Sequence, residues 1–140
     1  MLDTLENKNN LIALVGASND PKKYGNKILL DLVSKGYNVA PVNSKEKTIA
    51  GIKSYKNILD LKEPPSIINF VVPPSIGFRI TKELVENNFD NFWYQPGAES
   101  EEISYFLNEN KKNFIDDKCI MVVTKLNYCL LYTSPSPRDS

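Results

Sequence analysis

Residues 11–25 read LIALVGASNDPKKYG, and this stretch decides the fold. It opens with five apolar residues, Leu11 to Val15, a run whose length and composition are typical of a buried strand. Gly16 follows at once, and the next residues repeat apolar side chains at the spacing of a helix with one buried face. Asp20 is the expected N-cap of that helix, and Pro21 is its expected first residue. A strand that passes through a glycine into a helix is the building unit of a parallel α/β sheet.

Strand and helix patterns alternate through the rest of the chain. Short apolar runs bounded by Gly, Pro or Asn predict further strands. These runs are residues 37–42, 67–72, 91–95 and a last pair, 113–117 and 119–123, which forms either one strand or two with a kink. Amphipathic stretches after Ser75 and Ser100 predict further helices. The alternation predicts an α/β domain of three layers with a mostly parallel five-stranded sheet.

The composition excludes several classes of function. With 140 residues, 41% of them apolar, the chain has the size of one domain. Seventeen basic residues balance seventeen acidic ones, so neither nucleic acid nor an anionic membrane is an expected partner. The chain has no His, which excludes a Ser/His/Asp triad, His-ligated metals and phosphohistidine chemistry on its own residues.

The cysteines and the amino terminus predict a reducing, cytoplasmic location. Cys119 and Cys129 are too few for a disulfide framework and lack the C-x-x-C spacing of a zinc or redox site. The first residues are acidic and polar, unlike a signal peptide. No apolar run approaches the roughly 20 residues that a membrane span needs.

The last fifteen positions, residues 126–140, differ in composition from the rest of the chain. Ser and Pro become frequent from Ser134, and residues 131–139 resemble translated cloning-adaptor sequence. We therefore expect one domain over residues 1–125 and a disordered tail over residues 126–140, for which an artefactual origin is one interpretation.

The carboxyl ends of the predicted strands mark the candidate binding site. In an open parallel sheet, ligands bind at this edge, where the strand order reverses. Gly16 would let the backbone approach a phosphate closely, and the following helix would point its N–H groups at that phosphate. Ser18 would add a hydroxyl donor, and Gly25, which lacks a Cβ, would permit a tight approach. The loop after the first strand is therefore the predicted anion site.

Two alternatives bear on that site. Lysines that could face a ligand with several phosphates are Lys22, Lys23, Lys27, Lys45 and Lys47, but each is also explained as a solvated surface charge.

A dinucleotide fingerprint would need G-x-G-x-x-G and an acidic residue after the second strand. Gly16 and Gly25 are nine positions apart, and Asn43 stands where the acid belongs. An NAD(P)-binding oxidoreductase is therefore the disfavoured alternative.

Short motifs run through the chain in a fixed order. They are Val15-Gly16-Ala17-Ser18, Tyr24-Gly25, Gly36-Tyr37-Asn38-Val39, Pro41-Val42-Asn43, Ile49-Ala50-Gly51, Val72-Pro73-Pro74, Trp93-Tyr94-Gln95-Pro96-Gly97-Ala98 and Asp117-Lys118-Cys119. In this order they resemble the small single-domain CoA-binding protein family, which is related to the CoA-binding domain of the succinate–CoA ligase alpha subunit. The resemblance covers about residues 10–125. It implies a Rossmann-like fold and a binding module for CoA or an acyl-CoA, without catalytic machinery of its own.

The resemblance also implies which residues hold the ligand. The expected cofactor-binding residues are Gly16, Ala17, Ser18, Lys22, Lys23, Tyr24, Gly25, Asn43, Ser44, Lys45, Val72, Pro73 and Pro74. Residues 16–18 would hold the diphosphate, residues 43–44 would lie near the adenosine-side phosphates, and residues 72–74 would flank the nucleotide. One of the three lysines would neutralise the 3′-phosphate. The family usually has Pro at the position of Ser44, which leaves the shape of that loop open. No catalytic or metal-ligating residue is expected.

Two further interpretations stay open. The chain could be a subunit related to acyl-CoA ligases that lacks the catalytic His. The phosphohistidine step could then not occur on these residues, and the ligase domain would need a second chain or lost sequence. It could also act through protein contacts, for example as a homodimer formed by an exposed helix face. Under the favoured interpretation, the partner is the small molecule CoA, with no nucleic acid and no membrane involved.

Overall fold

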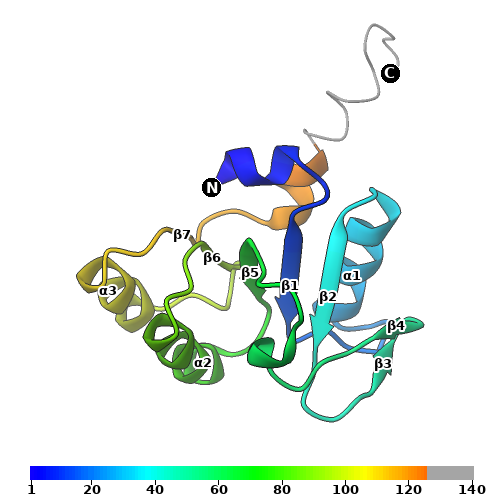
Figure 1. The fold of residues 1–140 in the computed structure, drawn as a ribbon, viewed down its shortest axis with the longest axis horizontal. Coiled ribbons are helices and arrows are strands. Elements are labelled where there is room, and N and C mark those ends of the chain that lie inside the picture. Colours follow the sequence, from blue (N-terminus) through cyan, green and yellow to red (C-terminus); the bar gives the residue numbers. More distant parts are fainter. Residues whose placement is uncertain (126–140) are drawn as a thin grey trace, which may run out of the picture.

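A five-stranded parallel sheet forms the centre of the computed structural model, which describes residues 1–125 (Figure 1). Its strands are β1 (Leu11–Val15), β2 (Asn38–Val42), β5 (Ile67–Phe70), β6 (Phe92–Tyr94) and β7 (Phe114–Ile115). They pair in the order β2-β1-β5-β6-β7, and every pair is parallel. The predicted α/β fold with a parallel five-stranded sheet is therefore confirmed. The tail predicted over residues 126–140 lies outside the described residues.

Helices cover both faces of this sheet. They are α1 (Tyr24–Ser34), α2 (Pro74–Glu86) and α3 (Glu101–Glu109), with the short 3-10 helices η1 (Leu2–Glu6) and η2 (Ile58–Asp60) and a small antiparallel hairpin of β3 (Thr48–Ile49) and β4 (Ile52–Lys53). Side chains of η1 and α1 belong to one core cluster, and those of η2, α2 and α3 belong to the other. The three layers are therefore helices, sheet and helices (Figure 1).

Alternation along β1 shows why both layers are needed. Ile12 and Leu14 pack into the cluster that contains α1, whereas Ala13 and Val15 pack into the cluster that contains α2. Successive side chains of a strand point to opposite faces, so a strand that is apolar at every position must be covered on both sides. All five residues of β1 are buried, which places this strand at the centre of the fold.

The strand order reverses between β1 and β5. From β1 the chain passes through α1 to β2 at one edge, and from β5 it passes through α2 to β6 on the other side. The two connecting helices lie on opposite faces, so a crevice opens between the carboxyl ends of β1 and β5. The fold thus places the loop after β1 at the position where ligands of such sheets bind.

Two predicted elements differ in the structure. Helix α1 begins at Tyr24, not at Pro21, because the carboxylate of Asp20 accepts from the N–H of Lys22 and closes a turn before the helix. The last predicted strand ends at β7, and residues 120–125 are helical. Ile120 and Thr124, four positions apart, are both fully buried, which is the period of a helix. A short apolar run does not distinguish a strand from a buried helical turn by itself.

Candidate functional site

A pocket of about 500 Å³ lies at the carboxyl ends of β1 and β5, where α1 begins. Its walls are formed by Gly16, Ala17, Ser18, Lys22, Lys23, Tyr24, Gly25, Asn43, Val71, Val72 and Pro73. The structure therefore brings together all of the residues predicted to bind a ligand, except Ser44, Lys45 and Pro74, which do not line this pocket. Val71 joins them without having been predicted.

Another pocket, of about 450 Å³, lies at the opposite edge of the sheet. Within residues 1–125, its lining includes asparagine, serine, threonine and proline residues and one charged side chain, Asp90, but no lysine or arginine. Asp90 forms an ion pair with Lys112. A pocket with this lining offers a phosphate no positive charge, whereas the pocket at the carboxyl edge is lined by Lys22 and Lys23 and is the candidate anion site.

Gly16 sits where the loops after β1 and β5 touch. Its φ is +102°, a conformation that residues with a side chain rarely adopt. A Cβ at this position would lie 2.9 Å from Cγ1 of Val72 and 3.0 Å from the carbonyl oxygen of Val71. Its N–H donates to the carbonyl of Val42 at the end of β2. The glycine thus allows three strand ends to meet at one point.

The loop that follows offers unpaired donors. Among residues 1–125, the backbone N–H groups of Ala17, Ser18 and Asn19 have no hydrogen-bond partner. The same holds for the N–H groups of Tyr24 and Gly25 in the first turn of α1. The N-cap residue Lys23 gives that turn no side-chain cap. Unpaired N–H groups at the positive end of a helix are the donors that bind phosphate in many α/β proteins.

Gly25 allows the first turn of α1 to approach the loop after β1 closely. A Cβ at this position would lie only 2.0 Å from the carbonyl oxygen of Gly16 and 3.2 Å from Cα of Ala17. No side chain fits in that space. The absence of a Cβ therefore lets the first turn of α1 and the loop after β1 present their N–H groups to one pocket.

Side-chain amides hold the carbonyl groups of the loop. Nδ2 of Asn43 donates to the carbonyl of Ala17 at 2.8 Å, and Nδ2 of Asn26 donates to the carbonyl of Ser18 at 3.0 Å. Oδ1 of Asn43 also accepts from the N–H groups of Lys45 and Glu46. Asn43 thus connects the loops after β1 and β2. The family resemblance implied that this side chain lies near the adenosine-side phosphates, and the structure places it in the pocket wall with its amide bonded to the backbone.

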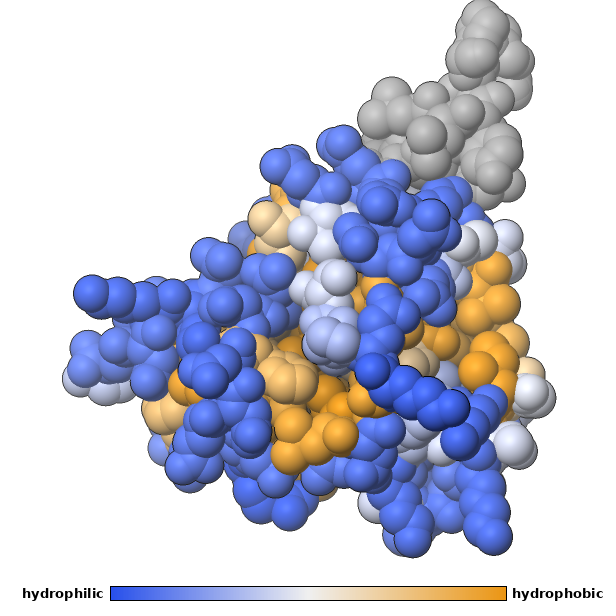
Figure 2. Space-filling model, in the orientation of Figure 1, coloured by the Kyte–Doolittle hydropathy of each residue, from blue (hydrophilic) through white to orange (hydrophobic). Residues whose placement is uncertain are grey.

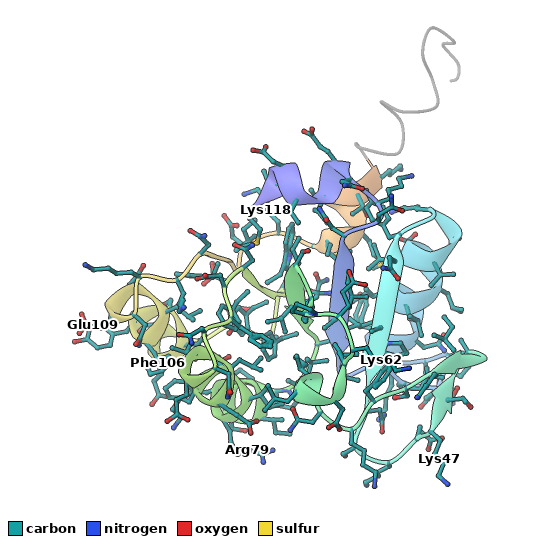
Figure 3. All side chains as sticks on the ribbon, viewed as in Figure 1. Lys47, Lys62, Arg79, Phe106, Glu109 and Lys118 are labelled. Atoms are coloured by element: carbon teal, nitrogen blue, oxygen red, sulfur yellow. The ribbon has the colours of Figure 1, made fainter. Side chains whose placement is uncertain are left out.

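The charge of the pocket is positive. Lys22 and Lys23 are exposed and line it, and within residues 1–125 neither forms an ion pair. Tyr24 is 64% exposed, and the Lys27 ammonium lies 5.5 Å from the centre of its ring. Lys47 lies just before the β3–β4 hairpin and is not among the lining residues (Figure 3). Among the residues that the structure describes, no carboxylate lines the pocket.

One wall of the pocket is apolar. It consists of Val71, Val72 and Pro73, which follow β5. Pro73 is the N-cap of α2 and Pro74 its first residue, a position that suits proline because no intrahelical N–H bond is lost there. An apolar area is also exposed where α2 and η2 face each other (Figure 2). Exposed apolar side chains of these two elements are Ile76 and Leu59.

Sequence reasoning missed Val71 and Asn26. The residues up to Val72 have the pattern of one strand, so the end of β5 at Phe70 could not be located. Val71 still donates its N–H to the carbonyl of Val15 as it leaves the sheet. Asn26, only 7% exposed, stands among helical residues with no local pattern to mark it. Only the folded position of Ser18 gives this amide its acceptor.

The far end of the carboxyl edge contains Gln95 and Cys119. Nε2 of Gln95 donates to Sγ of Cys119 at 3.1 Å, and Oε1 accepts from the N–H of Ile120. Trp93 and Tyr94 are fully buried. Within the described part of the chain, no group of three or more His, Cys, Asp or Glu residues could hold a metal ion. Residues 1–125 also include no helix that is long and apolar enough to cross a membrane.

Asp116 lies at the same edge in an unfavourable electrostatic environment. Partial burial raises the pKa of its carboxyl group, and the charges of Asp117 and Glu99 raise it further. The folded protein therefore holds this proton more tightly than the unfolded chain does. The contribution to stability is full below the ordinary pKa of Asp and is lost as the pH rises through the raised pKa.

Asp116→Asn is accordingly expected to raise the melting temperature at neutral pH. The gain over the unchanged protein should shrink as the pH is lowered below the ordinary pKa range of Asp, because both proteins then carry an uncharged side chain. Melting curves of both proteins from acid to neutral pH measure this difference. A variant that melts lower than the unchanged protein at neutral pH would contradict the prediction.

Known proteins with similar sequences indicate the family to which this pocket belongs. The model of a family described as CoA binding domain matches residues 10–125. The uncharacterized protein YneT of Bacillus subtilis is 28% identical over 111 residues, which are 79% of this chain and 82% of that protein. The alpha subunit of the ADP-forming acetate–CoA ligase II of Pyrococcus furiosus is 40% identical over 63 residues, which are 44% of this chain and 14% of that subunit.

Solved structures of other proteins have the same fold. A conserved hypothetical protein of Pyrococcus furiosus has 50% sequence identity and a TM-score of 0.78, with 81% of this chain and 97% of that chain covered. A protein of Thermus thermophilus has 29% identity and a TM-score of 0.79, with coverages of 90% and 96%. The family model spans nearly all of the described residues, so this chain belongs to the family of CoA-binding domains and is related to the acetate–CoA ligase subunits.

Proposed function

We propose that this chain binds CoA or an acyl-CoA in the pocket at the carboxyl ends of β1 and β5. The observation that carries the proposal concerns the backbone N–H groups of Ala17, Ser18 and Asn19. None of the three has a hydrogen-bond acceptor within residues 1–125. Together with the first turn of α1, these groups supply the donors that a diphosphate requires. Membership of the CoA-binding family supports CoA as the ligand that carries such a diphosphate.

The residues present fit the two chemical parts of CoA. Lys22 and Lys23 offer positive charge, and no carboxylate from residues 1–125 lines the pocket to compete with a phosphate for them. The wall of Val71, Val72 and Pro73 offers an apolar surface to the adenine. Ile76 in the first turn of α2, the helix that Pro73 caps, adds an exposed apolar side chain outside the pocket lining. We assign the phosphates to the loop after β1 and the nucleotide base to the apolar wall.

The proposal is for binding without a chemical step on this chain. The lining residues include no carboxylate, thiol or imidazole that could act as a general base. Ser18 carries a hydroxyl group, but its Oγ already accepts from the N–H of Asp20 and has no basic partner in the lining set. The lining groups supply donors, positive charge and an apolar wall for holding a ligand, and the proposal assigns them no reaction.

A role as part of an acyl-CoA ligase is the second candidate. It rests on the 40% identity with the alpha subunit from Pyrococcus furiosus, of which this chain spans 14%. This sequence has no His, so any phosphohistidine in such an assembly would come from residues outside it. CoA binding by this domain alone is common to both candidates.

Thermal unfolding of the full chain with CoA, dephospho-CoA, NAD and ATP in parallel tests the proposal. A ligand at one hundred times its dissociation constant adds about 2.7 kcal/mol of stability, which shifts the melting temperature by several degrees. We expect the largest shift with CoA. A shift with NAD alone would favour a nicotinamide-binding protein, and no shift with any of the four would overturn the proposal.

Replacing Lys22 and Lys23 together by Gln is expected to weaken CoA binding by about tenfold, because each charged hydrogen bond to phosphate is worth roughly 1–3 kcal/mol and exposed charges are partly screened. Lys47→Gln is the matched control, since Lys47 is exposed but lies outside the pocket. Calorimetric titration with CoA and dephospho-CoA measures the effect. If either lysine binds the 3′-phosphate, the loss will be larger for CoA than for dephospho-CoA.

If the double variant binds CoA as tightly as the unchanged protein, Lys22 and Lys23 do not contribute to the site. The same titrations at low and high salt provide an independent check. The double variant should show a weaker salt dependence than the unchanged protein, because fewer ionic contacts with the ligand remain to be screened.

A further inference from the structure

The two carbonyl groups that are held in the loop after β1 belong to successive residues. The carbonyl of Ala17 accepts from Asn43, which follows β2, and the carbonyl of Ser18 accepts from Asn26, which lies in α1. Asn26 is 93% buried, since only 7% of it is exposed. Two side chains from different elements thus determine where two neighbouring peptide groups point.

The orientation of a carbonyl group fixes that of the next N–H. In a planar trans peptide, the C=O of one residue and the N–H of the next point in opposite directions. A carbonyl of Ala17 that points toward Asn43 therefore turns the N–H of Ser18 away from Asn43. A carbonyl of Ser18 that points toward Asn26 turns the N–H of Asn19 away from Asn26. Both of these N–H groups lack a partner within residues 1–125.

The amides also remove a source of repulsion. A carbonyl oxygen that turned into the pocket would present a partial negative charge to an anion, and a bound phosphate would be disfavoured. Each amide N–H neutralises part of that charge and holds the oxygen in place. The loop is thereby fixed before any ligand arrives, which lowers the ordering cost of binding.

We propose that Asn26 and Asn43 are positioning residues, whose amide groups hold the loop of residues 16–19 in the conformation that binds phosphate. This inference rests on the proposed function, because it concerns the same pocket. It assigns a role to Asn26, a residue that lies outside the pocket lining, and it changes the role of Asn43 from a ligand contact to a support of the loop.

The test uses two substitutions at Asn26. Asn26→Ala removes the donor without adding charge and should weaken CoA binding by about tenfold at every pH, the loss expected for one hydrogen bond. Asn26→Asp replaces the donor by a carboxylate that repels the Ser18 carbonyl at neutral pH. Once protonated, its O–H can donate to that carbonyl, so affinity should recover as the pH is lowered, relative to the unchanged protein.

Asn43→Asp gives a second, independent measurement. A carboxylate at this position still accepts from the N–H groups of Lys45 and Glu46 but cannot donate to Ala17. We expect the same loss at neutral pH and the same recovery in acid. Asn91→Asp is the matched control, because Nδ2 of Asn91 donates to the carbonyl of Ser66 at the opposite edge of the sheet. Its CoA affinity should equal that of the unchanged protein.

Pyrophosphate provides a readout that does not depend on CoA. In amide NMR spectra of the full chain, it should shift the resonances of Ser18 and Asn19, and Asn26→Ala should reduce this shift. A folded Asn26→Ala variant with unchanged affinity, or resonances of Ser18 and Asn19 that do not respond, would overturn the inference. A normal pyrophosphate response without CoA binding would instead overturn the proposed function and leave the positioning role supported.

Discussion

Gly25→Ala is expected to lower CoA affinity by on the order of a hundredfold or more, the loss that corresponds to about two charged hydrogen bonds. The new Cβ would lie 2.0 Å from the carbonyl oxygen of Gly16 and 3.2 Å from Cα of Ala17. Both of these are backbone atoms, so the clash cannot be relieved by a side-chain rotation. Either the first turn of α1 or the loop after β1 must move, and the shared pocket for their N–H groups is lost.

The same substitution should destabilise the fold by about 1–3 kcal/mol, the range for an overpacked site. Gly77→Ala is the matched control in α2. A Cβ there would lie 3.6 Å from Val72 and 3.7 Å from Phe70, which is ordinary van der Waals contact. Since Ala is favoured over Gly within helices by up to about 1 kcal/mol, this control should keep or raise the melting temperature and retain CoA binding.

Calorimetry with CoA and melting curves without ligand separate the two effects of Gly25→Ala. A variant that is folded at the temperature of the titration but has lost CoA binding would support the close approach as a requirement of the site. Unchanged affinity would show that the N–H groups of the loop after β1 and of the first turn of α1 do not bind the same ligand.

The sheet and its binding edge were predictable because their signals are local. Leu11 to Val15 form a continuous apolar run, and Gly16 interrupts it where a strand must turn into a helix. Such runs and their glycine boundaries depend on the nearest neighbours in the sequence. The position of the predicted pocket follows from the topology of a parallel sheet alone, which is why most of its predicted residues lie together.

The features that the sequence did not predict depend on contacts between distant segments. The amide of Asn26 finds its acceptor at Ser18 only after α1 has packed against the loop. Ile120 begins a helix because its N–H is bound by Oε1 of Gln95, twenty-five positions earlier. Lys45 was expected in the pocket as a candidate for the 3′-phosphate and Pro74 from its motif, but neither lines the pocket, and Pro74 is instead the first residue of α2.

Thr81→Val is expected to lower the free energy of unfolding by about 1–3 kcal/mol, the largest effect on stability that we predict for a single polar contact away from the pocket. Oγ1 of Thr81 donates to the carbonyl of Gly77 at 2.7 Å, so the Tyr94 hydroxyl, 2.5 Å away, must donate to Oγ1. Both side chains are fully buried. Valine would leave the phenol O–H without an acceptor in the core.

Tyr94→Phe should cost less, because it removes the donor and leaves Thr81 bonded to Gly77. Burial raises the pKa of the Tyr94 hydroxyl far above its ordinary value, so the group remains a neutral donor throughout the usual pH range. The double variant should be close in stability to Tyr94→Phe, since neither side chain then has an unsatisfied polar group. Chemical denaturation of the four proteins measures the coupling between the two residues.

Titration of the same four proteins with CoA, well below their melting temperatures, shows whether stability and binding are separate. Thr81 and Tyr94 connect α2 to β6, on the sheet face opposite α1, and neither lines the pocket. If binding depends on the local geometry of residues 16–19, all four proteins will bind CoA equally despite their different stabilities. A loss of affinity in Thr81→Val that parallels its loss of stability would instead place control of the pocket in α2, through Pro73 at its amino end.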